Sequence, residues 1–387
     1  MRISKRVERI PLSRTLALDT RAKQLAAEGK DIVNLAGGEP DFDSPSVVRD
    51  AATACIEGGR VRYTPAAGLR SLRAAVANHL KATRGVPFEP EQVAICHSCK
   101  HALSGALLTL CEEGDDVLIP EPAWVSYMEQ VRFVGATPVG VPPRPDMGPD
   151  FEALEAAVTS KAVGLMLNSP NNPSGYTWSE PELQRLVEFA ERHDLWILSD
   201  EIYGRMTFDT DLYGSPVRLG DSARARTVVV DGASKSFAMT GYRIGFVAGP
   251  PEVAAAVARL HSQLTGAPNT VGQEAYEAAL GEEPEEVPGM MEAFKRRRDH
   301  VVARLEAIGL RTPVPGGAFY AFPDIRGIQP DGDSDRFCEA LLEEQGLALV
   351  PGSAFGVPHH VRMCFAASLE TLDDGLDRLE RFAASRR

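Results

Sequence analysis

Short runs of aliphatic and β-branched residues alternate along the chain with segments whose apolar residues recur at helical spacing. One such segment follows Ser179, where Leu183, Leu186 and Ala190 fall on one face of a helix. Ser179 and Glu182 have the spacing of a capping box at its start. The alternation predicts an α/β fold with a largely parallel sheet.

A second helix with well-marked ends is expected between residues 44 and 58. Ser44 is a suitable N-cap residue, and Pro45 suits the first helical position because it lacks a backbone N–H. Gly58 is suited to end the helix. We therefore expect this helix to begin at Pro45.

Polar residues gather where five of the predicted strands end. In each of the following five pairs the strand comes first and the polar segment after it: "QVAI" and "CHSCK", "DVLIP" and "EPAWVSY", "VGLMLN" and "SPNNPSG", "LWILS" and "DEIY", and "TVVVD" and "GASKSF". Ligands of open α/β sheets bind beyond the carboxyl ends of the strands. We therefore expect these five segments to meet at one crevice.

Composition and charge limit the kinds of partner. The 387 residues are 25% charged and 44% hydrophobic, as in ordinary globular proteins, and at roughly 150 residues per domain they suggest two or three domains. A net charge of −13 argues against a nucleic-acid partner, and we interpret the basic run 295–298 as the solvated face of a helix. No segment reaches the roughly 20 apolar residues of a membrane helix. Six scattered cysteines favour a reduced, cytoplasmic protein.

Lys235 and Asp200 are the first candidates for chemistry. Lysine is a poor nucleophile at neutral pH because its pKa is about 10.4, but burial among small residues lowers that value and makes Lys235 a candidate for Schiff-base formation. Asp200 follows an apolar run, where an unpaired carboxylate is unfavourable. It could cap the next helix, or it could hold a proton on a buried heteroaromatic nitrogen.

Seven motifs together resemble the class I and II aminotransferases, which are pyridoxal-phosphate enzymes of fold type I, and most closely the bacterial aspartate aminotransferases. In chain order they are "GGEPDF", "YTPAAG", "PAWVSY", "NSPNNPSG", "SDEIY", "SKSFAMTGYRIG" and "PGGAFY". The resemblance implies a large cofactor-binding domain at residues 45–285, with a mostly parallel seven-stranded sheet sandwiched by helices. A smaller α+β domain would combine residues 1–44 with residues 286–387.

The resemblance also implies roles around the cofactor ring. Lys235 would form the Schiff base with the cofactor aldehyde, and Asp200 would pair with the ring nitrogen. Tyr203 and Asn172 would hydrogen-bond the 3′-oxygen. Trp124 would stack on the ring, where its flat apolar face suits the contact. The catalytic residues implied are thus Lys235, Asp200 and Tyr203.

The phosphate of the cofactor would lie at the turn after "QVAI". Backbone N–H groups at Ser98, Cys99 and Lys100, at the positive end of a helix, would bind it. Arg243 would neutralise it, and Ser234 would add a hydroxyl. Tyr63 would reach the same phosphate from a neighbouring subunit, which implies a homodimer with shared active sites.

Substrate binding would use two further groups. Arg362 would hold the α-carboxylate with its planar guanidinium, a contact that lysine does not reproduce. Gly38 would offer its backbone to the same carboxylate, with Trp124 and Asn172 beside it. These residues imply a small amino acid and a 2-oxo acid as substrates.

Lys100 matches a lysine that some bacterial aspartate aminotransferases use for the distal carboxylate, and Ser13 matches a nearby hydroxyl. An exposed lysine in the first turn of a helix is the alternative. If Lys100 faces the site, it favours acidic substrates. Aspartate as donor and 2-oxoglutarate as acceptor are the expected pair.

The segment "CHSCK" and residue 232 depart from the family pattern. Cys99 stands where relatives commonly have a small residue, and Gly232 stands where many have a phosphate-binding serine. A metal or redox site built on Cys96 and Cys99 is an alternative interpretation. Adjacent strand residues point apart and no second CxxC exists, so no metal site is predicted.

Other activities remain open on the same fold. They include a C–S β-lyase, a decarboxylase, and an aromatic or alanine-type aminotransferase, because one fold supports many chemistries. A non-catalytic regulator that binds pyridoxal phosphate is a further hypothesis. Such regulators carry an added DNA-binding domain, whereas here the aminotransferase-like sequence begins almost at residue 1.

Overall fold

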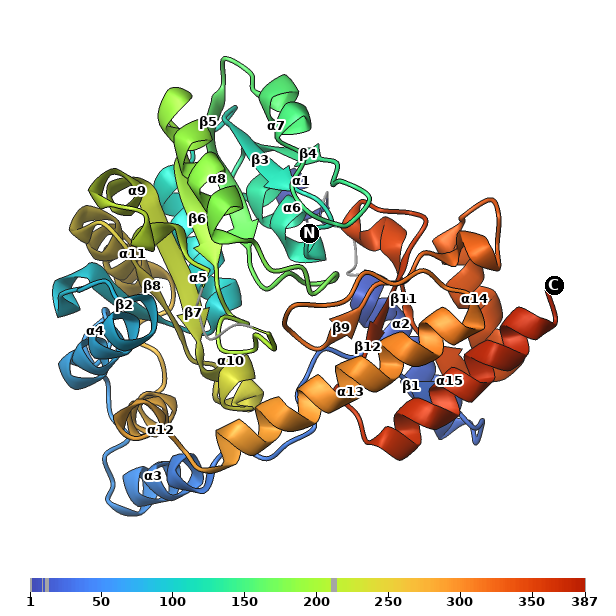
Figure 1. Ribbon diagram of the computed structural model, residues 1–387. Coiled ribbons are helices and arrows are strands. Elements are labelled where there is room, and N and C mark those ends of the chain that lie inside the picture. Colours follow the sequence, from blue (N-terminus) through green and yellow to red (C-terminus); the bar gives the residue numbers. More distant parts are fainter. Residues whose placement is uncertain (1, 9, 11–13, 210–213, 387) are drawn as a thin grey trace.

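The protein is described by a computed structural model that covers residues 2–8, 10, 14–209 and 214–386. Its largest sheet has seven strands in the order β2-β8-β7-β6-β5-β3-β4 (Figure 1). In chain order these are β2 (Val93–Cys96), β3 (Asp116–Pro120), β4 (Thr137–Val141), β5 (Ala162–Asn168), β6 (Trp196–Asp200), β7 (Thr227–Gly232) and β8 (Gly245–Ala248).

The sheet is mostly parallel, as the sequence predicts. Only β8 runs antiparallel to its neighbours β2 and β7, and the pairs among β3 to β7 are parallel. All six residues of β7 are buried, which fits a strand covered on both faces. The carboxyl ends of β5, β6 and β7 therefore meet at one edge of the sheet.

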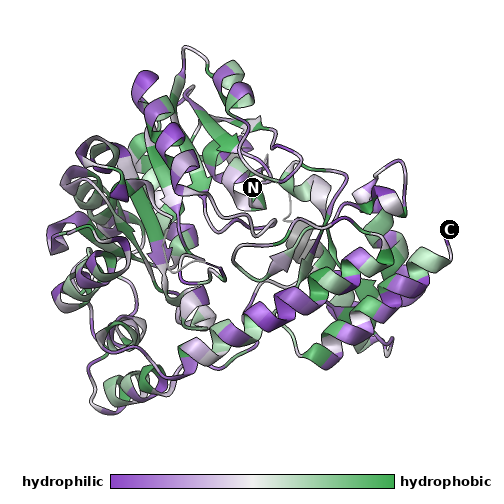
Figure 2. Cartoon of the chain, viewed as in Figure 1, coloured by the Kyte–Doolittle hydropathy of each residue, from purple (hydrophilic) through white to green (hydrophobic). Residues whose placement is uncertain are grey.

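Helices cover both faces of this sheet (Figures 1 and 2). On one face, apolar residues of α5 (Cys99–Leu110) and α11 (Pro251–Leu264) pack with β2 and β7. On the other face, α4 (Arg70–Arg84) and α12 (Thr270–Gly281) pack with the same two strands. The remaining helices of this part are α3 (Ser46–Glu57), α6 (Val125–Phe133), α7 (Phe151–Ala157), α8 (Glu180–Arg192), α9 (Asp221–Arg226) and α10 (Ala233–Ser236).

A second, smaller region contains short strands and long helices. Strand β1 (Val33–Asn34) pairs with β10 (Leu347–Ala348), and β12 (Val361–Cys364) lies between β11 (Val350–Pro351) and β9 (Tyr320–Ala321). The helices here are α2 (Arg14–Ala27), α13 (Glu286–Ile308), α14 (Ser334–Gln345) and α15 (Leu369–Ala384). The short α1 (Lys5–Glu8) is drawn apart from them, close to α6 (Figure 1). The two-part α/β architecture is confirmed, while the exact domain limits remain a prediction.

The two helices predicted in detail are present. Helix α8 begins after Ser179, which forms the expected capping box with Glu182. Helix α3 begins at Ser46 and not at Pro45, because Pro45 occupies the N-cap position and its carbonyl accepts the first helical N–H groups. The prediction of Ser44 as N-cap was thus wrong by one residue.

The interpretation of the basic run 295–298 as a solvated face was wrong for half of it. The run lies in α13, where Arg297 and Arg298 face inward and are buried. Arg297 donates to both carboxylate oxygens of Asp41, at 2.7 and 2.9 Å, and Arg298 pairs with Asp209. Buried guanidinium groups need such partners.

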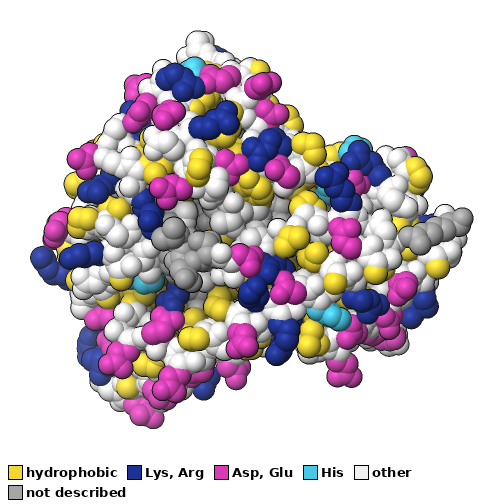
Figure 3. All heavy atoms as spheres, viewed as in Figure 1, with side chains coloured by type: hydrophobic (Ala, Val, Ile, Leu, Met, Phe, Trp, Pro, Cys, Tyr) yellow, Lys and Arg dark blue, Asp and Glu magenta, His cyan; other side chains and the backbone are white. Residues whose placement is uncertain are grey.

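On the face shown in Figure 3, acidic and basic side chains are intermixed.

No helix in the described part of the chain is long and apolar enough to cross a membrane.

Candidate functional site

The five strand ends meet at one pocket of about 520 Å³, as predicted. It also receives residues of the smaller region, including Gly38 and Arg362. Of the residues predicted for the site, the pocket is lined by Gly38, Ser98, Cys99, Lys100, Trp124, Asn172, Asp200, Tyr203, Ser234, Lys235, Arg243 and Arg362. Tyr63 does not line it, and Ser13 lies outside the described residues.

Lys235 lies in α10, a short helix that begins directly after the last residue of β7. Its amine donates a hydrogen bond to the carbonyl of Gly38 and lies 5.7 Å from the centre of the Phe319 ring. Burial at the end of the sheet lowers the pKa of Lys235 to about 8. About a tenth of this amine is therefore neutral, and nucleophilic, at pH 7, far more than for an ordinary lysine.

Asp200 is the last residue of β6, and its side chain is buried. Burial raises the pKa of Asp200 to about 7, although two hydrogen bonds oppose the rise. They come from the Tyr127 hydroxyl at 2.7 Å and the Ile202 backbone N–H at 3.2 Å. Tyr127 was not singled out from the sequence, although it is the last residue of the motif "PAWVSY".

A buried ionic network lies behind Asp200, and nothing in the sequence pattern pointed to it. Arg84, at the end of α4, donates to Glu201 at 3.0 Å and to Asp231 at 2.7 Å. Glu201 also accepts from Ser199 and Ser215. The network links Glu201, directly after β6, to Asp231, near the end of β7. It therefore stabilises the end of β6, which carries Asp200, and the end of β7, which leads into the helix of Lys235.

Arg362 lies in β12, with its guanidinium buried at the pocket wall. It donates to Asn172 Oδ1 at 2.9 Å and to the Ala36 carbonyl at 2.7 Å. Its Nε makes no hydrogen bond within the described part of the chain. The guanidinium also lies 4.5 Å from the centre of the Tyr320 ring, and Tyr320 and Tyr203 share a 2.9 Å hydrogen bond between their hydroxyls.

The opposite end of the pocket is formed by the turn between β2 and α5. Ser98 precedes α5 with φ of 80°, and its hydroxyl accepts from Arg243 at 3.0 Å. Arg243 itself has φ of 57° and also donates to the Thr240 carbonyl. Ser234 is buried nearby at the start of α10. This end therefore combines a guanidinium, two hydroxyls and the N-terminus of a helix.

The two departures from the family pattern, Cys99 and Gly232, lie in contact with each other. A Cβ atom built on Gly232 would come within 2.9 Å of Cys99 Sγ and 2.6 Å of the Gly245 Cα. The thiol therefore fills space between β7 and β8 that a side chain at residue 232 would need. The burial of Cys99 suits this packing role.

Lys100 and Trp124 face each other at the side of the pocket. The Lys100 amine lies 4.8 Å from the centre of the indole ring. Lys100 as a whole is exposed, but partial burial of its amine and, secondly, the nearby charge of Arg243 lower the pKa of Lys100. Two like charges at one pocket wall favour the binding of an anion between them.

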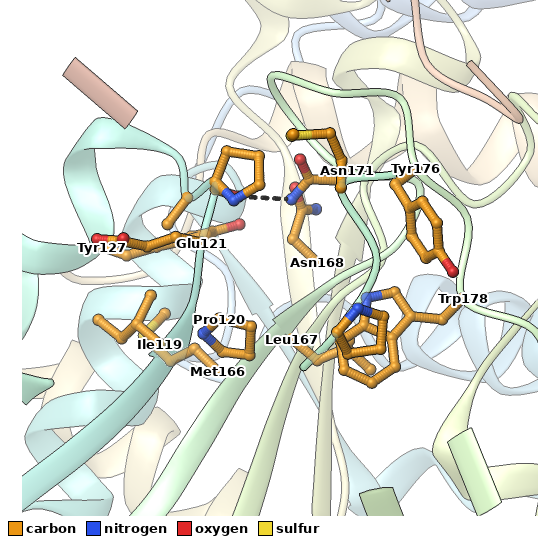
Figure 4. Close-up of a pocket in the computed structure, with 14 residues that line it drawn as sticks. Ile119, Pro120, Glu121, Tyr127, Met166, Leu167, Asn168, Asn171, Tyr176 and Trp178 are labelled. Atoms are coloured by element: carbon orange, nitrogen blue, oxygen red, sulfur yellow. Dashed lines mark hydrogen bonds between the residues drawn. The ribbon is translucent and has the colours of Figure 1, made fainter. Parts of the chain in front are cut away.

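A much smaller cavity, of about 20 Å³, lies beside the pocket and shares Tyr127 and Asn168 with it (Figure 4). Burial raises the pKa of Glu121, on its wall, to about 7. The cavity is large enough for little more than a water molecule. It therefore does not compete with the larger pocket as a substrate site.

Comparison with known proteins agrees with this geometry. Residues 30–379 match the family "Aminotransferase class I and II". The chain belongs to this family of aminotransferases. Curated relatives include the aspartate aminotransferase of Bacillus subtilis, 39% identical over 99% of both chains. The aspartate/prephenate aminotransferase of Cereibacter sphaeroides is 38% identical over 99% of this chain and 98% of the relative.

Solved structures of aminotransferases have the same fold. The aspartate aminotransferase of Thermus thermophilus with maleate superposes with a TM-score of 0.94 and is 39% identical, covering 99% of this chain and all of that one. The fold type I assignment is thereby confirmed. The protein is a pyridoxal-phosphate-dependent aminotransferase.

The pocket fits this cofactor on its own geometry. Lys235 offers an amine with a lowered pKa to the aldehyde, and the buried Asp200 offers a carboxylate to a protonated ring nitrogen. Arg243 and Ser98 lie at the helix N-terminus where an anionic phosphate would be stabilised. All of these groups line the same pocket.

Proposed function

We propose that this aminotransferase moves the amino group of L-aspartate to 2-oxoglutarate, with Lys235 as the residue that bonds to the cofactor. The observation that carries the proposal is that one pocket is lined by Lys235 and Asp200 together with two further cationic side chains, Arg362 and Lys100. A dicarboxylate amino acid has one carboxylate for each. The Thermus thermophilus relative, with bound maleate, also accepts a dicarboxylate.

Lys235 is the proposed general base and acid. Pyridoxal phosphate, when bound, supplies a ring that stabilises negative charge at the substrate Cα. Once the Lys235 amine is no longer bonded to the cofactor, it takes the proton from the substrate Cα. It later gives a proton to the C4′ carbon of the cofactor. A pKa near 8 suits this exchange, since both forms of the amine are accessible near neutral pH.

Asp200 is proposed to hold the proton on the ring nitrogen of the cofactor. Among the described residues no cation pairs with its buried carboxylate, and its pKa is raised first by burial and then by the nearby Asp231 and Glu201 carboxylates. A positively charged nitrogen beside it favours the ionised carboxylate. Tyr127 then orients the carboxylate through its 2.7 Å hydrogen bond, and Tyr203 and Asn172 are proposed to bind the ring oxygen.

The other predicted residues have binding roles in this proposal. Arg362 binds the α-carboxylate of the substrate, and Gly38 approaches it with its backbone. Trp124 covers one face of the ring. At the phosphate end, the proposed ligands are Arg243, Ser234 and the backbone of Ser98, Cys99 and Lys100.

We also propose that the active sites are shared in a homodimer. Tyr63 is fully exposed and does not line the pocket of its own chain. Val61 and Ile56 nearby are also largely exposed. A second copy of the chain would cover these apolar side chains and place Tyr63 at the neighbouring phosphate site. A cytoplasmic location remains a prediction, and it is compatible with six free cysteines.

Steady-state kinetics with a panel of amino donors would test the substrate proposal. We expect aspartate with 2-oxoglutarate to give the highest kcat/KM, above alanine and tyrosine. Since some relatives are named for prephenate as well, prephenate belongs among the acceptors. Absence of turnover with aspartate would contradict the substrate assignment, and turnover of cysteine conjugates alone would favour a β-lyase.

The variant Lys100→Gln tests the distal carboxylate site. Loss of a charge-assisted contact of roughly 1.5–3 kcal/mol corresponds to about a 10- to 150-fold lower kcat/KM for aspartate. The value for alanine, which has no distal carboxylate, should stay near that of the unaltered enzyme. Lys161→Gln, at an exposed lysine outside the pocket, is the matched control. An equal loss for both substrates would contradict the role of Lys100.

A further inference from the structure

A cluster of histidine and cysteine side chains lies beside the pocket but outside the proposed catalytic machinery. Cys96 is the last residue of β2, His101 lies in the first turn of α5, and His261 lies in α11. One ligand atom from each residue lies within 4.8 Å of those from the other two. Among the described residues this is the one group of three histidine, cysteine or carboxylate side chains that meets so closely.

The histidine rings are packed against one another. The centres of the His101 and His261 rings are 4.7 Å apart. His97 lies at the edge of the cluster, with its ring centre 5.2 Å from that of His101 and 6.4 Å from that of His261. Three imidazoles and a thiol therefore share one small volume between β2, α5 and α11.

His261 lacks the hydrogen bonds that a buried imidazole needs. Its side chain has no exposed surface, and neither ring nitrogen makes a hydrogen bond of normal geometry within the described ranges. The ring makes at most one weak contact, a backbone hydrogen bond with Ala66 whose geometry lies outside normal limits, so at least one buried ring nitrogen has no partner among the described residues. His101 Nδ1 is also buried and unpartnered among these residues. Buried polar atoms are rarely left in this state, so a ligand between the rings is indicated.

We propose that Cys96, His101 and His261 form a zinc site. Thiolate and imidazole are the ligands that Zn²⁺ prefers, usually in a tetrahedral arrangement with Zn–S near ~2.3 Å and Zn–N near ~2.0 Å. Ligand atoms up to 4.8 Å apart need to close by up to roughly 1.5 Å to reach that geometry. On binding, the Cys96 thiol releases its proton to solvent and the thiolate bonds to the ion.

The fourth position of the ion is available to water or to His97. The His97 Nε2 is held only by a 3.4 Å contact to the Gly266 carbonyl, so the ring can turn without breaking a strong bond. His97 and His101 are half-buried, whereas Cys96 and His261 are buried. Entry of the ion is therefore from the side of the two half-buried rings.

Zinc at this position would join three elements that surround the turn at Ser98. Cys96 precedes this turn and His101 follows it, and Ser98 accepts the hydrogen bond of Arg243. The ion would tie the turn to α11, and bound protein would resist unfolding more strongly than metal-free protein. The role of the site is therefore to hold the turn in place, and it is separate from the chemistry at Lys235.

Metal content of the untagged, full-length holoenzyme tests the proposal directly. After dialysis against a chelator, incubation with zinc chloride and desalting, we expect about one zinc per chain by elemental analysis. Zinc should also raise the melting temperature. X-ray absorption of the zinc-loaded protein should show one sulfur ligand together with nitrogen or oxygen ligands.

Three variants distinguish zinc bound at this site from zinc bound elsewhere on the protein surface. Cys96→Ala, His101→Gln and His261→Gln should each bind zinc about tenfold more weakly or worse, since even outer-shell changes have effects of this size. Cys111→Ser and His193→Gln, outside the cluster, should keep the zinc content and the thermal shift. His101→Gln changes only a half-buried ring, so it serves if the buried variants fail to fold.

The proposal is overturned if the unaltered holoenzyme retains no more zinc than the three cluster variants retain. It is also overturned if the bound zinc has no sulfur ligand, or if His101→Gln binds zinc as tightly as the unaltered chain. None of these outcomes depends on aminotransferase activity, so they leave the proposed function untouched.

Discussion

Asp200 and Lys235 have pKa values displaced toward neutrality from opposite directions, and burial is the first cause for both. Burial disfavours the charged form of either group, so it raises the pKa of a carboxyl and lowers that of an amine. Neither value follows from residue type alone. Both follow from a buried position: Asp200 is the last residue of β6, and Lys235 lies in the helix that follows β7.

For Asp200, the raised pKa predicts a pH-dependent effect on stability. The folded, cofactor-free protein binds a proton at Asp200 up to about pH 7, whereas the unfolded chain loses it near pH 4. Stability from this group is therefore present below pH 4 and is lost as the pH rises to 7. Asp200→Asn should be more stable than the unaltered apoprotein at pH 8, by on the order of 4 kcal/mol, with a smaller gap at pH 5.

Urea unfolding of the cofactor-free proteins at the two pH values measures this gap. Asp194→Asn is the matched control, because the Asp194 side chain is fully exposed. A gap for Asp200→Asn that does not change with pH would contradict burial of an ionisable carboxyl as its cause. The same variant should lose most of its aminotransferase activity, since an amide does not stabilise a positively charged ring nitrogen.

For Lys235, the lowered pKa predicts the pH dependence of cofactor attachment. Only the neutral amine reacts with an aldehyde, and with a pKa of about 8 roughly a tenth of it is neutral at pH 7. The rate at which the apoprotein takes up pyridoxal phosphate should rise with pH, reach half of its maximum near pH 8 and level off near about pH 9. Stopped-flow absorbance records this rate, and a plateau only above pH 10 would show an unperturbed lysine.

At the scale of elements, the site depends on three parallel strands ending side by side. Asn168, Asp200 and Gly232 end β5, β6 and β7. Asn168 donates to the Asp200 carbonyl at 3.0 Å and accepts from the Asn172 backbone at 2.8 Å. Contacts between neighbouring strand ends thus fix the loops that carry the site residues.

The Arg84 network is a buried ionic link between the ends of β6 and β7, and its loss should be severe. Arg84→Met leaves the carboxylates of Glu201 and Asp231 buried without their cation. We expect destabilisation by about 3–5 kcal/mol. Thermal or urea unfolding measures it, with the exposed Arg70→Met on the same helix as control, for which less than about 0.5 kcal/mol is expected. Similar values for both variants would contradict the structural role of the network.

At the scale of the whole molecule, the shared-site homodimer makes a specific prediction for mixed subunits. Lys235→Ala and Tyr63→Ala should each impair the homodimer that carries them. In a mixed dimer, one site combines Lys235 of one chain with Tyr63 of the other and is intact. Coexpression in equal amounts should therefore restore about a quarter of the normal activity, since about half of the dimers are mixed and each has one good site.

Activity assays of the coexpressed, purified protein give the answer. No gain over the two separate variants would mean that Tyr63 acts within its own chain or not at all. Gel filtration of the unaltered protein gives an independent check, because a monomer would exclude a shared site.

The sequence alone was enough for the fold class and for most of the pocket. Strand periodicity and the polar residues after five strands predict a parallel sheet with one crevice, and Lys235 and Asp200 lie in it. Arg243 and Arg362, which only the resemblance to a known family implied, line the same pocket. These features are local in the chain, so they leave a local signal. Helix ends are less sharply defined, which explains the one-residue error at Ser46.

Only the tertiary structure decided how residues distant in sequence pair in space. Tyr127 against Asp200, Arg84 against Asp231, and Cys99 against Gly232 have no periodic signature, because each pair is formed by the packing of separate elements. The same holds for His261, which α11 brings to Cys96 and His101. Burial, and with it the pKa values of Lys235 and Asp200, is likewise set by everything packed around a residue and not by its neighbours in the chain.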